Sequence, residues 1–147
     1  MKIVIPSILA VGLLATCLST SASEQGAIDF RQSAMTIYKW YLKPMGAMAK
    51  GKSPFDVDAF RANARGLANA AELDILPGFP KGSGFDTESK DEIWEDWSGF
   101  GEKFRALQTE ARKLAEVAAT GDEAQMKAQF GITAKTCGGC HDKFREK

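Results

Sequence analysis

Four segments of the sequence carry apolar residues at helical spacing, and this pattern restricts the fold more than any other feature. Apolar residues recur at steps of three, four and seven within residues 27–50, 57–73 and 90–119, and again from Asp122 to the C-terminal motif. This is the period of an amphipathic helix, and no stretch shows the alternation typical of a half-buried strand. Four helices that each bury one stripe pack most simply as an antiparallel bundle. We therefore predict an all-α, antiparallel four-helix bundle.

Glycine, proline and aspartate residues indicate where these helices begin and end. Gly51 ends the first segment, Asp56 is placed to cap the second, and Gly121 stops the third. Residues 76–89 contain two prolines and three glycines, so they predict a long loop, and loops of that length are usually functional. Pro44 lies inside the first segment and predicts either a kink or two shorter helices.

The N-terminus has the pattern of a secretory signal peptide. Lys2 precedes an unbroken apolar run that gives way to small residues near Ala22. The apolar run is shorter than the roughly 20 residues that a membrane-spanning helix needs. We predict a cleaved signal peptide at residues 1–22, which removes Cys17, and one domain at residues 23–147. The mature chain is then expected in the periplasm, with no membrane span.

Charge and composition narrow the classes of partner. The chain has 19 Lys and Arg residues against 19 Asp and Glu residues, so its formal net charge is zero. A balanced charge gives no general attraction for phosphate backbones, and we expect no nucleic acid partner. With 147 residues, the chain is long enough for one hydrophobic core, and we therefore expect one functional site.

The sequence Cys137-Gly138-Gly139-Cys140-His141 near the C-terminus carries the chemistry. Cys-x-x-Cys-His is the attachment pattern of c-type haem. Two thiols three residues apart on one helical turn can each add to a vinyl group, and the next residue presents an imidazole to the iron. We therefore predict one covalently bound haem c, with Cys137 and Cys140 as its attachment points and His141 as the proximal iron ligand.

Three other interpretations of this motif fit less well. A redox Cys-x-x-Cys pair usually opens a helix within a βαβ unit, whereas this one closes an all-helical chain. A structural zinc site needs four ligands, and the motif supplies only two thiolates and one imidazole. A disulfide between Cys137 and Cys140 would close a very small loop and stabilise little.

The position of the motif in a four-helix chain resembles the class II cytochromes c, the cytochrome c′ family. The resemblance covers nearly the whole mature chain, through residues 30–35, 49–51, 54–56, 92–94 and 128–131. In that family an Arg-Gln pair on the first helix lies against the haem and its propionates, which implies this role for Arg31 and Gln32. The family's loop before the third helix touches the haem edge, which implies a backbone contact from Thr87, Glu88 or a neighbour.

The resemblance also identifies the position that faces the iron from the distal side, four residues after Arg31, and here it is Met35. Cytochromes c′ proper carry a non-ligating residue there and leave a five-coordinate iron open to small gases. Members with Met at this place are low-spin electron carriers, and this sequence resembles them. The residues alone do not identify a sixth iron ligand. Because the single histidine is already used, a methionine is expected, and the candidates are Met35, Met45, Met48 and Met126.

These observations predict a periplasmic one-electron carrier with His141 and Met35 as iron ligands, and not an enzyme. The alternative is a five-coordinate cytochrome c′ that binds nitric oxide or carbon monoxide. Partners would be redox proteins met in transient contact, and the sequence leaves open whether two chains form a homodimer. Steering of an acidic partner is expected from cations near the haem helix: Lys135, Lys143, Arg145 and Lys147.

Overall fold

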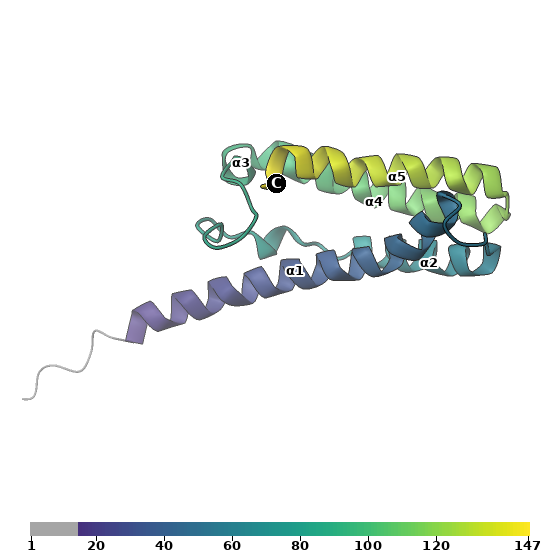
Figure 1. Ribbon diagram of the computed structural model, residues 1–147. Coiled ribbons are helices and arrows are strands. Elements are labelled where there is room, and N and C mark those ends of the chain that lie inside the picture. Colours follow the sequence, from purple (N-terminus) through teal and green to yellow (C-terminus); the bar gives the residue numbers. More distant parts are fainter. Residues whose placement is uncertain (1–14) are drawn as a thin grey trace, which may run out of the picture.

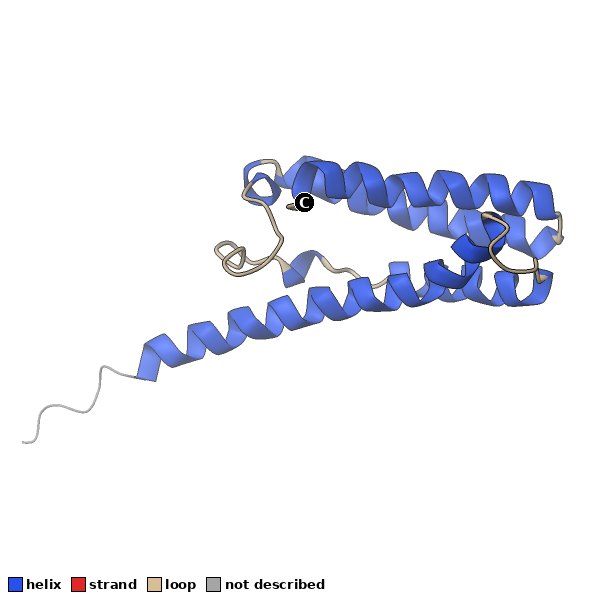
Figure 2. Cartoon of the chain, in the orientation of Figure 1, coloured by secondary structure: helices blue, strands red, loops and turns tan. Residues whose placement is uncertain are grey.

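The structure is a computed structural model that describes the backbone of residues 15–147 and the side chains from residue 23 onward. Its elements are α1 (Ala15–Ala49), α2 (Val57–Ala71), a 3₁₀ turn (Leu76–Gly78), α3 (Glu92–Glu95), α4 (Trp97–Thr120) and α5 (Glu123–Phe144). Figure 2 shows helices and loops only in the described part of the chain, so the prediction of an all-α fold is confirmed. The predicted signal peptide lies largely outside the described residues and stays a prediction.

The four long helices form a bundle that is closed at one end and open at the other. In Figure 1, α4 and α5 run side by side, whereas α1 diverges from them towards the end that holds α3 and the C-terminus. The helix α2 packs against both α1 and α4, and α1 touches α5 only sparsely. The segment between α2 and α4 closes over the open end, where Ser89 and Arg145 form an isolated antiparallel β-bridge.

Helix ends follow the local signals in the sequence. The carboxylate of Asp56 accepts a hydrogen bond from the backbone N–H of Ala59 at 2.9 Å and caps α2. Asp122 caps α5 in the same way, through the N–H of Gln125 at 3.0 Å. Gly121 has a φ of 79°, a left-handed conformation that costs glycine little, and it ends α4 as predicted.

Two helices differ in continuity from the sequence pattern. Of the two alternatives for Pro44, two shorter helices are excluded, because α1 continues through Pro44 to Ala49, and a kink stays a prediction. The predicted single helix at residues 90–119 is divided into α3 and α4 at Asp96, which has φ −122° and ψ 61°. The physical reason is a cap inside the apolar stripe: the carboxylate of Asp96 accepts a hydrogen bond from the N–H of Gly99 at 3.0 Å and starts a new helix.

The closed end of the bundle is packed by the chain's own apolar side chains. Each of the four long helices contributes a fully buried side chain there, and these are Met45, Phe60, Leu114 and Met126. The aromatic residues of α4 differ in burial. Phe100 and Phe104 are 5% and 6% exposed, whereas Trp97, in the first turn of the helix, is 43% exposed.

Candidate haem site

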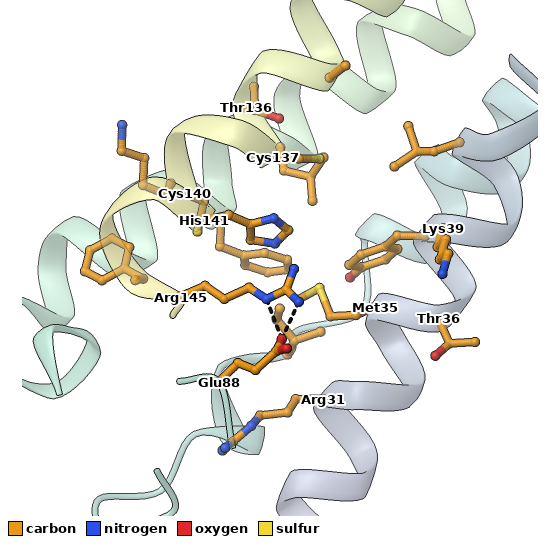
Figure 3. A pocket seen from close by; sticks show the side chains of 18 of the residues that line it. Arg31, Met35, Thr36, Lys39, Glu88, Thr136, Cys137, Cys140, His141 and Arg145 are labelled. Carbon is orange, nitrogen blue, oxygen red and sulfur yellow. Dashed lines mark hydrogen bonds and ion pairs between the residues drawn. The ribbon is translucent and has the colours of Figure 1, made fainter. Parts of the chain in front are cut away.

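A cavity of about 1430 Å³ lies between α1 on one side and α4 and α5 on the other. Figure 3 shows it from close by, with the motif residues on α5 facing Met35 and Lys39 on α1. Every residue that the sequence nominated for the site lines this one cavity: Arg31, Gln32, Met35, Glu88, Cys137, Cys140 and His141. Residues that are more than 100 positions apart in the sequence, such as Met35 and His141, therefore meet at one site.

The two cysteines are free thiols on one turn of α5 and are partly buried in the cavity wall. Burial, with the neighbouring Cys137, raises the pKa of Cys140 to about 11, against a smaller lowering by Lys103. Burial also raises the pKa of Cys137. Both side chains are therefore thiols at neutral pH. Gly138, between the two thiols, is exposed, and an added Cβ there would meet nothing within 4 Å.

His141 follows on the same helical turn and is accessible from the cavity. Burial and then the positive charge of Arg145 lower the pKa of His141, while Asp142 and Glu88 act in the opposite direction. The neutral imidazole, which has a lone pair available for a metal, is favoured as a result. The last helical hydrogen bond of α5 runs from the N–H of Arg145 to the carbonyl oxygen of His141 at 3.1 Å, and the helix ends before Arg145, whose backbone is extended with φ −128° and ψ 139°.

Arg31 is buried, at 3% exposure, and holds the loop that forms one wall of the cavity. Its guanidinium donates to the carbonyl oxygen of Gly78 at 2.9 Å, and to the hydroxyl and carbonyl oxygens of Ser83 at 2.7 and 2.5 Å. It also lies over the ring of Phe79, 4.7 Å from the centroid. None of these partners is a carboxylate. A buried cation of this kind is suited to an anionic group in the cavity, as the resemblance implied.

The methionines separate into two groups. Met45, Met48 and Met126 are buried in the core, at 0%, 5% and 0% exposure. Met35 is 38% exposed and is the only one of these four that lines the cavity. Figure 3 shows its sulfur directed from α1 into the cavity, towards the helix that carries His141.

Glu88 and Arg145 join the loop to the C-terminal end of α5 at the mouth of the cavity. The guanidinium of Arg145 forms an ion pair with the carboxylate of Glu88, with the Nε to Oε2 distance at 2.6 Å (Figure 3). The backbone adds two contacts, since the N–H of Glu146 donates to the carbonyl of Glu88 and the N–H of Lys90 donates to that of Phe144. Sequence reasoning named Arg145 only as a cation that could steer a partner, although it follows His141 by four residues, the spacing of one helical turn.

Sequence reasoning also missed Tyr38 as a site residue. The structure places it in the cavity wall, 4% exposed, with a hydroxyl that has no hydrogen-bond partner. The signal that could have found it is its spacing, three residues after Met35 and therefore on the same helical face.

These residues fit haem c. The cavity offers two free thiols, one imidazole, a buried guanidinium and an apolar wall from α4 that includes Phe100, Phe104 and Leu107. The described residues contain no group of three His, Cys, Asp or Glu side chains that would hold a metal ion by themselves, so they do not form the zinc site considered above. In the same part of the chain, no helix has the length and apolar character needed to cross a membrane.

Comparisons with known proteins agree with this chemistry. The profile of the family described as Cytochrome C′ matches residues 26–145. The chain is 38% identical over 131 residues to a cytochrome c′ of Halomonas halodenitrificans, covering 84% of this chain and 98% of that protein. Among solved structures, cytochrome c prime from Shewanella frigidimarina superposes with a TM-score of 0.80 at 37% identity, covering 84% and 97% of the two chains. The nitric oxide complex of a mutant cytochrome c prime from Alcaligenes xylosoxidans superposes with a TM-score of 0.75 at 31% identity, covering 84% and 97%.

Proposed function

This chain belongs to the cytochrome c′ family, whose members bind haem c covalently, and from that premise we propose how its own residues hold and use the haem. Cys137 and Cys140 carry it through thioether bonds, and His141 is its proximal iron ligand. The cavity supports this assignment because both thiols and the imidazole line it from one helix. Arg31 and Gln32 contact the carboxylates of the haem, and the loop around Glu88 contacts its edge.

The proposed function is the binding of nitric oxide or carbon monoxide at a five-coordinate iron. The observation that carries it is the nitric oxide complex of a mutant of a relative, which this chain matches over 97% of that protein's length. The comparisons give no support to the low-spin subtype in which Met35 is an iron ligand, and this favours the alternative interpretation of the sequence over the electron carrier. When bound, haem c supplies an iron with one open position for a small gas.

The side chains around the cavity then act as walls and supports. Met35 fills the distal side without ligating, as a flexible apolar side chain can. Aromatic and aliphatic residues of α4 would give the haem an apolar wall. Arg31 holds the loop over the open end, and the ion pair of Glu88 with Arg145 fixes that loop to the turn that follows His141.

One observation favours a second candidate, one-electron transfer with Met35 as the sixth ligand. Met35 is the only one of the four methionines weighed above that lines the cavity, and a thioether is a known haem ligand that raises the reduction potential. In this case no gas would bind to the iron without displacing the sulfur.

The optical spectrum of the reduced holoprotein, with and without carbon monoxide, tests the two candidates. Gas binding predicts a broad high-spin spectrum that shifts when carbon monoxide is added. Met35→Leu is the matched variant, and it should leave this spectrum high-spin. Sharp split bands with little response to carbon monoxide, together with a change to high spin in Met35→Leu, would instead establish the electron carrier.

If the protein transfers electrons, it needs transient redox partners. The structure changes which cations are expected to attract such a partner. The sequence nominated four cations near the haem helix: Lys135, Lys143, Arg145 and Lys147. Two of them are engaged within the protein, Lys143 with Asp96 at 2.5 Å and Arg145 with Glu88. An ion pair reduces the field that each presents to a partner.

Five further lysines line the cavity and are better placed. They are Lys39 and Lys43 on α1, Lys50 and Lys52 just after it, and Lys103 on α4; all are exposed, and none is in an ion pair within residues 23–147. An acidic partner protein would approach the cavity from this side.

We also propose that the chain is exported to the periplasm and that it is not an enzyme. A homodimer is the proposed assembly, and light scattering would test it.

A further inference from the structure

The hydroxyl of Tyr38 stands out among the buried polar groups. It is the one buried side-chain nitrogen or oxygen atom without a hydrogen-bond partner among the described residues. Tyr38 is 4% exposed and lines the same cavity as Met35 and His141. An unpaired buried hydroxyl is unfavourable, and buried tyrosine hydroxyls usually find a partner. A partner therefore has to come from what fills the cavity.

The protonation of Tyr38 defines what kind of partner it needs. Burial, together with a smaller effect of Cys137, raises the pKa of Tyr38 to about 12. The phenol keeps its proton at neutral pH and is available as a hydrogen-bond donor. The nearby hydroxyl of Thr36 does not compete, because it already donates to the carbonyl oxygen of Gln32 at 3.0 Å.

The place of Tyr38 on α1 separates it from the anion-binding part of the cavity. It lies seven residues after Arg31, which is about 10 Å along a helix. Tyr38 and Cys137 line the same cavity, and the thiol of Cys137 adds to the raised pKa of Tyr38. The thiols take up vinyl groups, which are on the opposite edge of a haem from its carboxylates. The haem carboxylates are therefore poor candidates for the missing acceptor.

We propose that the hydroxyl of Tyr38 donates a hydrogen bond to a small diatomic ligand bound on the α1 side of the cavity. Met35, one helical turn away, supplies only apolar contact, so Tyr38 is the polar contribution of α1 to ligand discrimination. This inference rests on the proposed gas-binding function and adds to it a residue that determines specificity. Ligands whose outer atom gains negative charge on binding benefit most from such a donor.

The test compares Tyr38→Phe with the wild type as haem-loaded full chains. The probe is carbon monoxide, with the C–O stretching frequency measured by infrared spectroscopy in H₂O and D₂O. We expect Tyr38→Phe to raise the frequency and to abolish a small H₂O/D₂O difference. Loss of one hydrogen bond should also speed carbon monoxide dissociation by about threefold to tenfold.

Tyr41→Phe is the matched control. Tyr41 lies on the same helix but packs against Gly66 of α2, where an added Cβ would stand 2.2 Å from its ring, and it does not line the cavity. Its loss of a hydroxyl should change neither the frequency nor the dissociation rate. Because the phenol of Tyr38 has no partner within the protein, Tyr38→Phe is expected to fold as well as the wild type.

The outcomes separate the two proposals. If wild type and Tyr38→Phe bind carbon monoxide with the same frequency and the same dissociation rate, the role of Tyr38 is disproved while gas binding stands. If the wild type forms no carbon monoxide complex, the proposed function fails and the hydrogen bond fails with it. An equal shift in Tyr41→Phe would assign the effect to helix packing and would also overturn the inference.

Discussion

The two ends of the bundle differ in how their apolar and polar side chains are buried. At the closed end, Phe60, Leu114 and Met126 are fully buried by neighbouring side chains of the same chain. At the open end, Met35 remains 38% exposed, Tyr38 has a hydroxyl without a partner, and both line a large cavity. The closed end is therefore a core that the chain fills with its own side chains, whereas the open end is a site that is completed by the cofactor.

Removal of both thiols should have the largest effect and act on the open end alone. Cys137→Ser combined with Cys140→Ser leaves no nucleophile for thioether bonds, so we expect complete loss of covalently bound haem. Haem staining after denaturing electrophoresis measures this directly. The melting temperature should fall as well, because a ligand that binds only the folded state stabilises it. Haem that stays with the denatured double variant would contradict the assignment.

Truncation at the closed end should be the largest single-residue effect on stability. Phe60→Ala removes a ring that is 0% exposed and stacks with Phe55 at 5.2 Å, and such changes cost about 3–5 kcal/mol. Urea denaturation of the holoprotein measures the loss, and the haem spectrum should not change. Phe85→Ala is the control, because Phe85 is 90% exposed and should alter the free energy of unfolding by less than about 0.5 kcal/mol. Similar losses in both variants would remove the distinction between the ends.

Arg31→Gln should have an intermediate effect that is confined to the open end. It leaves the carbonyl oxygens of Gly78 and Ser83 without their charged donor, at a cost of about 1–3 kcal/mol in the free energy of unfolding. Hydrogen exchange should quicken in residues 78–87 and stay slow around Phe60. Faster exchange spread evenly over both ends would show that Arg31 supports the whole bundle rather than the loop.

The smallest expected effect is a dependence on pH at the two caps. A hydrogen bond from Lys143 lowers the pKa of Asp96 at the open end, and a hydrogen bond from the N–H of Gln125 lowers that of Asp122 at the closed end. A lowered carboxyl pKa stabilises the fold above the ordinary value of about 3.9, and the stability is lost as pH falls through the folded-state pKa. Asp96→Asn and Asp122→Asn should each flatten the fall in melting temperature between about pH 5 and pH 2. Only Asp96→Asn should also lose sensitivity to salt, since its cap includes an ion pair.

Local features of the sequence were sufficient for most of the helices. The stripes predicted the four long helices, and Asp56 and Gly121 predicted where α2 begins and α4 ends. These signals are local because a cap or a left-handed turn involves residues only a few positions apart. Asp96 shows the limit, since its cap divides a stripe that continues smoothly in the sequence.

By itself the sequence determined the class of fold, the pairing of two thiols with one imidazole, and the family. The tertiary structure decided which methionine lines the cavity, why Arg31 is buried and that Tyr38 has no partner. The partners of Arg31 lie 47 to 56 positions away in the chain, and Cys137 reaches the surroundings of Tyr38 from the last helix. A periodic stripe states which face of a helix is buried, but the register between helices sets which side chains meet across the bundle. Only packing fixes that register.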